Sequence, residues 1–151
     1  MQLHAATKLT VLAVIPGAED QESLRVILAR STWELRLVST FQQAQRALDD
    51  PAIGVIIADP DLPDGHSWQH IASAAAQLAP PPSVIVASRL GDDRLWAEVL
   101  NLGGFDLILK PFDAKEVLHS IGMAWRCWSD KAVLTDAARA RREGLLQSAE
   151  G

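Results

Sequence analysis

The sequence predicts an α/β fold in which helices cover both faces of a five-stranded parallel sheet. Short apolar, β-branched runs alternate five times with helix-like runs, and strands that alternate with helices of about three turns usually form parallel sheets. Most of the strand-like runs are almost continuously apolar, as strands are when both faces of the sheet are buried. The 151 residues suffice for one domain with a substantial core.

Three segments begin the alternation. Residues 9–15, "LTVLAVI", form an apolar run that predicts a strand buried on both faces. Residues 19–30 predict a helix, because acidic side chains occupy the first turn and the leucine and isoleucine side chains share one face. Residues 33–38, "WELRLV", alternate between apolar and polar side chains, which indicates a half-exposed strand.

The next three segments repeat the pattern. Residues 40–48, "TFQQAQRAL", predict a second helix whose Thr-x-x-Gln spacing is a capping box. Residues 53–58, "IGVIIA", predict the third strand. Residues 67–79 predict the third helix, which ends before three consecutive prolines.

Two strands and two helices complete the chain. Residues 83–88 and 105–110 are apolar runs that predict the fourth and fifth strands. Residues 92–102 lie between them and predict a helix that two glycines stop. Asp113 then predicts the N-cap of a long last helix, with Glu116 three residues further on.

The composition excludes several classes of function. A formal charge of −5 and a pI near 5.3 argue against a general binder of nucleic acids or anionic membranes. Cys127 is the single cysteine, so neither an intrachain disulfide nor a clustered-thiol metal site can form. The apolar run of residues 11–15 is too short to span a membrane. We therefore expect a cytoplasmic protein with no direct nucleic-acid partner and no membrane partner.

Three polar side chains come at the ends of predicted strands: Asp59, Ser88 and Lys110. The carboxyl ends of the strands form the edge where open α/β sheets bind ligands, so we expect these side chains to meet there. A carboxylate can attack phosphorus, while an ammonium and a hydroxyl can hold the phosphoryl oxygens. Singly the residues are typical of turns, caps and solvated charges, but together they predict a phosphoryl acceptor site.

Three motifs surround these residues: "IIADPDLP", "SVIVAS" and "LILKPF", with 29 residues from Asp59 to Ser88 and 22 from Ser88 to Lys110. In these motifs and intervals, residues 8–128 resemble the receiver domain of two-component response regulators. The resemblance implies a flavodoxin-like sheet with the strand order 2-1-3-4-5. It also implies that Asp59 is the phosphoacceptor, Ser88 the switch hydroxyl and Lys110 the phosphate-pairing lysine, with a cis peptide bond before Pro111.

The sequence departs from this family where a metal ion would bind. The family's first strand ends in two adjacent acids that hold Mg²⁺, but Ile15 and Pro16 take their places here. Mg²⁺ needs oxygen ligands, and the transfer of a phosphoryl group between two anions depends on that ion. We therefore expect Mg²⁺ to bind weakly or not at all, and phosphorylation to be slow or absent.

Other charged residues could rebuild part of the site. Glu19 and Asp20 follow near the start of the first helix, where acids also simply favour a helix N-terminus. Asp61 comes two residues after Asp59, and these two are the candidate metal ligands, although a loop acid is the plainer interpretation of Asp61. Arg89 replaces the small residue that usually follows the switch hydroxyl, and it could pair with Asp59 or Asp61 or lie in solvent.

The last helix is longer than a receiver domain requires. We expect the receiver domain to occupy residues 1–128 and residues 129–151 to form a helical C-terminal extension or linker. A stripe of apolar side chains is predicted to pack on the sheet: Val117, Leu118, Ile121, Trp125 and Trp128. Beyond this stripe the apolar pattern weakens, which leaves a dimerising helix, a connector to another domain and a frayed end as open interpretations.

Two functions from different classes follow. The first is a receiver of a two-component phosphorelay, not an enzyme, that accepts a phosphoryl group on Asp59 from a sensor histidine kinase or phosphotransfer protein and contacts further partners, a homodimer among them. The alternative is a degenerate receiver that acts as a protein-interaction module without phosphorylation, which Ile15 and Pro16 favour. A small flavodoxin-like enzyme or cofactor binder is a distant third interpretation, because the chain lacks a glycine-rich phosphate loop.

Overall fold

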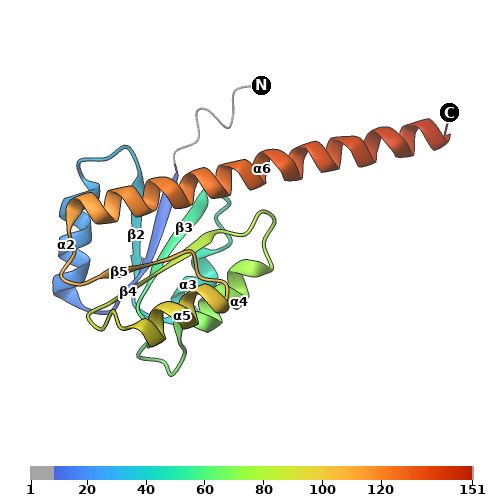
Figure 1. Ribbon diagram of the computed structural model, residues 1–151. Coiled ribbons are helices and arrows are strands. Elements are labelled where there is room, and N and C mark those ends of the chain that lie inside the picture. Colours follow the sequence, from blue (N-terminus) through green and yellow to red (C-terminus); the bar gives the residue numbers. More distant parts are fainter. Residues whose placement is uncertain (1–8, 151) are drawn as a thin grey trace.

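The computed structural model describes residues 9–150, and the side chains of residues 9–144. It contains one parallel sheet with the strand order β2-β1-β3-β4-β5, which confirms the predicted fold class and order (Figure 1). Along the chain the elements are β1 (Thr10–Val14), α2 (Ala18–Leu28), β2 (Glu34–Val38), α3 (Phe41–Ala47), β3 (Ile53–Ala58), α4 (Trp68–Ala76), β4 (Ser83–Ser88), α5 (Asp93–Asn101), β5 (Asp106–Leu109) and α6 (Ala114–Glu150).

Side-chain caps set several of the helix boundaries. Thr40 is the N-cap of α3, where its hydroxyl accepts a hydrogen bond of 3.1 Å from the Gln43 amide. The Gln43 side chain accepts from the Ser39 amide rather than from Thr40, so the second half of the predicted capping box is displaced by one residue. A carboxylate oxygen of Asp113 accepts from the Glu116 amide at 3.0 Å, which confirms the predicted cap of α6.

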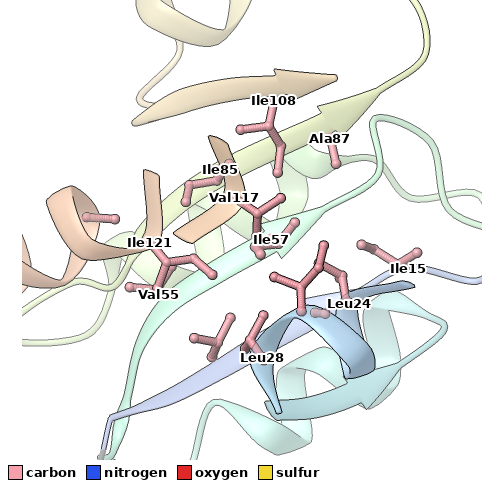
Figure 2. Packing of buried hydrophobic residues seen from close by; sticks show 14 of the residues in the cluster. Ile15, Leu24, Leu28, Val55, Ile57, Ile85, Ala87, Ile108, Val117 and Ile121 are labelled. Atoms are coloured by element: carbon pink, nitrogen blue, oxygen red, sulfur yellow. The ribbon is translucent and has the colours of Figure 1, made fainter. Parts of the chain in front are cut away.

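The helices cover the sheet in two layers. On one face α2 and α6 pack over the strands, and Figure 2 shows the apolar side chains of this layer, among them Leu24, Ile57, Val117 and Ile121. On the other face α3, α4 and α5 bury a second cluster that includes Trp68. All residues of β1, β3 and β4 are buried, whereas β2 at the edge is partly exposed, as its alternating sequence predicts.

The strand register brings the predicted functional positions to one rim of the sheet. Val14 pairs with Ala58 where β1 and β3 end, and the amide of Asp59 donates to the carbonyl of Val14 at 3.1 Å. At the other side of β4, Ser88 pairs with Leu109. The residues that follow these strands therefore emerge at the same edge, which is the condition for a shared site.

The 37-residue helix α6 lies along one face of the sheet and continues well past it (Figure 1). Its packed stripe differs from the prediction at one position, because Trp125 is 40 % exposed and Ala124 is buried instead. Val117, Ile121 and Ala124 follow the i, i+4, i+7 spacing of one helix face, and these three side chains are buried. None of the described helices combines the length and apolar character that crossing a membrane requires.

Gly54 of β3 provides a test of how α6 docks. A Cβ atom at Gly54 would lie 2.6 Å from Cδ2 of Trp128 and 2.9 Å from Cδ1 of Leu9. We expect Gly54→Ala to lower the free energy of unfolding by about 1–3 kcal/mol, because the extra methyl group overfills this contact. Urea unfolding followed by circular dichroism measures the change.

Gly122 of α6 is the matched control. A Cβ atom there would meet only the tip of the Trp33 ring at 3.8 Å, an ordinary contact. Gly122→Ala should therefore leave stability unchanged or raise it by up to about 1 kcal/mol, the helix preference of alanine over glycine. A Gly54→Ala protein as stable as the wild type would contradict the close packing of Trp128 on β3.

Candidate functional site

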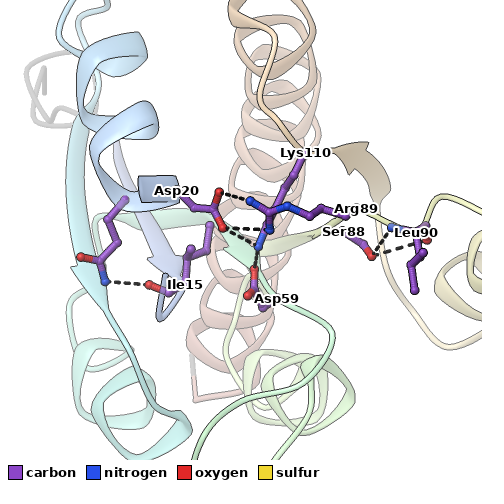
Figure 3. Close-up of polar contacts among 8 residues, drawn as sticks. Ile15, Asp20, Asp59, Ser88, Arg89, Leu90 and Lys110 are labelled. Atoms are coloured by element: carbon purple, nitrogen blue, oxygen red, sulfur yellow. Dashed lines mark hydrogen bonds and ion pairs between the residues drawn. The ribbon is translucent and has the colours of Figure 1, made fainter. Parts of the chain in front are cut away.

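Asp59 and Lys110 meet at the carboxyl edge of the sheet. Asp59 follows β3 and Lys110 follows β5, with β4 between them. The Lys110 ammonium donates a hydrogen bond of 2.6 Å to Oδ1 of Asp59 (Figure 3). The side chain of Lys110 is only 4 % exposed and that of Asp59 is 16 % exposed. Two of the three residues predicted to meet here are therefore in direct contact, and the Lys110–Pro111 peptide bond is cis, as the resemblance implies.

A second carboxylate reaches the same ammonium from the first helix. Oδ2 of Asp20 lies 3.0 Å from Nζ of Lys110, and the Asp20 side chain is 11 % exposed. Asp20 lies in the first turn of α2, while its neighbour Glu19 is exposed to solvent. Gly17 leaves room for the Asp20 carboxylate, because a Cβ atom at residue 17 would lie only 3.1 Å from Oδ2 of Asp20. Of Glu19 and Asp20, the two acids near the start of α2, it is Asp20 that lies at this rim.

Arg89 completes the charged cluster. Its guanidinium holds both oxygens of Asp20, with Nη2 at 3.1 Å from Oδ1 and Nη1 at 3.4 Å from Oδ2. The sequence suggested Asp59 or Asp61 as the acid for Arg89, and the structure places it on Asp20 instead. Arg89 follows β4, and its side chain extends across the rim to the start of α2 (Figure 3).

Ser88 lies at the rim but its hydroxyl is turned away from the acids. The carbonyl of Ser88 accepts from the Lys110 amide at 3.0 Å, which fixes its place at the edge. Its Oγ accepts from the Leu90 amide at 3.0 Å, and Figure 3 shows this contact apart from the Asp59–Lys110 pair. Among the described side chains, no hydrogen bond joins Oγ of Ser88 to Asp59 or Lys110. In this conformation Ser88 orders the loop after β4.

The oxygens at this rim do not fit a Mg²⁺ site. Mg²⁺ prefers about six oxygen ligands at about 2.1 Å, but the buried side chain of Ile15 offers none, and cations hold both oxygens of Asp20. Asp61 is exposed, and its backbone pairs with Ser67. Within the described part of the chain, no group of three or more His, Cys, Asp or Glu side chains is arranged to hold a metal ion.

The cluster shifts the pKa values of its two carboxyl groups in opposite directions. Burial alone would raise the pKa of Asp20, but the hydrogen bonds and positive charges of Lys110 and Arg89 together lower it below the usual Asp value. Burial raises the pKa of Asp59, and the negative charge of Asp20 raises it further. The hydrogen bond and the charge of Lys110 lower this pKa, but they offset the rise only in part. Asp20 is thus the acid that the surrounding cations stabilise.

This asymmetry predicts how stability depends on pH. The folded-state pKa of Asp20 lies below the ordinary value of about 3.9, so its stabilisation is present above that value and is lost as the pH falls through the lowered pKa. We expect Asp20→Asn to cost about 1.5–3 kcal/mol of unfolding free energy near pH 7, as charged hydrogen bonds do. The cost should shrink as the pH falls below the ordinary Asp value of about 3.9. Urea unfolding at pH 7 and at several pH values below about 3.9 measures it.

Glu19→Gln is the matched control for this experiment. Glu19 is the exposed acid next to Asp20 in the same first turn, and its loss should change the unfolding free energy by no more than about 0.5 kcal/mol. Equal effects of the two substitutions at neutral pH would contradict the ion pairing of Asp20.

Solved structures show the same fold. The signal receiver domain described as that of a Luxo repressor protein from Vibrio parahaemolyticus has a TM-score of 0.76 and 21 % identity, over 84 % of this chain and 97 % of that chain. That of an HD domain-containing protein from Pseudomonas fluorescens Pf-5 has a TM-score of 0.74 and 20 % identity, over 83 % and 93 % of the two chains. NtrX from Brucella abortus has a TM-score of 0.75 and 20 % identity, over 86 % of this chain and 29 % of its own.

A comparison with curated proteins finds no match. The family model of the response regulator receiver domain matches residues 18–122, which is well over half of the chain. This match contains Asp59, Ser88 and Lys110, together with Asp20 and Arg89. The chain therefore belongs to the response regulator receiver domain family.

Proposed function

We propose that this chain is a cytoplasmic receiver of a two-component phosphorelay, which accepts a phosphoryl group on Asp59. The donor would be a phosphohistidine of a sensor histidine kinase or of a phosphotransfer protein. Receiver domains are signalling modules that interact with such donors. The observation that carries the proposal is the contact of 2.6 Å between the Lys110 ammonium and the Asp59 carboxylate at the carboxyl edge of the sheet.

The geometry gives each residue a step in the transfer. An oxygen of Asp59 would attack phosphorus while the bond from phosphorus to the histidine nitrogen breaks, and that nitrogen keeps the electron pair and takes a proton. Lys110 would then share its ammonium between the aspartyl phosphate and Asp20, so that positive charge faces the phosphoryl oxygens. Ser88 would act as the switch only after its hydroxyl leaves the Leu90 amide that it now accepts from.

A second candidate function rests on a different observation. Ile15 and Pro16 replace the family's acidic pair, and the acid that does reach the rim is already paired with Arg89. A receiver held in one state by these contacts would act as an interaction module without phosphorylation. Its contact surface toward a second copy or another protein would use the exposed apolar side chains of α5 and β5: Trp96, Leu100 and Leu109.

Phosphorylation by a small donor tests the first function. Wild-type protein incubated with phosphoramidate should gain one phosphoryl group in intact-mass spectra, and Asp59→Asn should gain none. Asp61→Asn is the control, because Asp61 is an exposed acid two residues away and its loss should leave the added mass unchanged. Wild-type protein that takes up no phosphoryl group, with or without a divalent ion, would contradict the proposal. Self-association of Asp59→Asn equal to that of the wild type would then favour the second candidate.

A further inference from the structure

The charged rim of this receiver is electrically balanced by its own side chains. The carboxylates of Asp20 and Asp59 carry two negative charges, and Lys110 and Arg89 carry two positive charges. In the family pattern, two further acids at the end of the first strand require a divalent cation for the same balance. Here those positions hold Ile15 and Pro16, so both the acids and the need for the ion are missing together.

Arg89 supplies a positive charge to the Asp20 carboxylate from within the chain. A planar guanidinium can hold two carboxylate oxygens at once, which makes its pair more directional than that of an ammonium. Both oxygens of Asp20 are engaged in this way at 3.1 and 3.4 Å. The Asp20 carboxylate is nearly buried, whereas the Arg89 side chain is 59 % exposed. Most of the Arg89 side chain thus lies in solvent, while its guanidinium contacts the nearly buried Asp20 carboxylate at the rim.

A divalent ion at this place would meet two obstacles. It would have to remove Arg89 from Asp20 to gain a carboxylate oxygen of Asp20 as a ligand, since Lys110 and Arg89 already hold those oxygens. It would also lie beside the Lys110 ammonium, which is almost fully buried and cannot turn to solvent. Repulsion between like charges is strong where water does not screen them.

We propose that the Arg89 guanidinium takes the place of the divalent metal ion at this rim, with Asp20 as its anchor. Arg89 is therefore a positioning residue that keeps the site neutral and closed to Mg²⁺. A consequence for phosphorylation, which rests on the proposed function, is that Lys110 and Arg89 together would face the phosphoryl oxygens on Asp59. The replacement of the metal ion itself does not depend on that function.

Titration with Mn²⁺, followed by the relaxation rate of water protons, tests this proposal. Arg89→Gln removes the charge but keeps a polar side chain at an exposed position. We expect it to bind Mn²⁺ at least about tenfold more tightly than the wild type, because the positive charge beside the ion opposes binding by more than about 1.4 kcal/mol. The control is Arg94→Gln, at an exposed arginine of α5, which should match the wild type.

A double variant assigns the site of any gained affinity. In Arg89→Gln combined with Asp20→Asn, the gain should disappear, because the uncovered ligand is the Asp20 carboxylate. Cooperative thermal unfolding, measured by circular dichroism, verifies that each variant is folded. Wild-type affinity equal to that of Arg89→Gln, or a gain that survives the loss of Asp20, would overturn the proposal. Failure of Asp59 to accept a phosphoryl group would contradict the proposed function and leave this titration unaffected.

Discussion

The buried ammonium of Lys110 requires oppositely charged partners, and the arrangement of the rim follows from this constraint. A charge removed from water costs several kcal/mol unless oppositely charged or hydrogen-bonded groups surround it. The parallel sheet meets this need by delivering Asp59 from β3 and Lys110 from β5 to one edge, while α2 contributes Asp20 from its first turn. The pairing therefore links two strands and a helix, and it gathers the three charges at the carboxyl edge of the sheet.

The departure from the family pattern changes where the acids come from but preserves the balance of charge. Ile15, which directly follows β1, has an apolar, fully buried side chain, and its carbonyl accepts from the Gln21 side chain at 2.7 Å. The carboxylate reaches the rim from the following helix instead of from the strand. Because a single acid replaces a pair, one arginine suffices to neutralise it. The chain thus keeps Asp59 and Lys110 in contact at the rim, while an isoleucine and a proline stand in the positions of the family's acidic pair.

The sequence alone predicts the sheet, its helices and the Asp59–Lys110 contact, because these follow from periodicity and from motifs at the strand ends. It does not predict that Arg89 pairs with Asp20, since 69 residues separate them and the pairing depends on the paths of two loops. The orientation of the Ser88 hydroxyl is not predicted either, because it depends on the path of the loop that follows β4. The exposure of Trp125 does not follow from helical spacing alone, because residue 124 (seven after Val117) and residue 125 (four after Ile121) both fit the spacing of one face.

The central claim is that Lys110 and Asp59 form one energetically coupled unit at the edge of the sheet. A double-mutant cycle on unfolding free energy, with Asp59→Asn, Lys110→Met and the combined variant, measures that coupling directly. Removal of Lys110 alone leaves two carboxylates without their shared cation, so the combined variant should be less destabilised than the sum of the single changes by about 0.5–3 kcal/mol. Single effects that add to within about 0.3 kcal/mol would contradict the account.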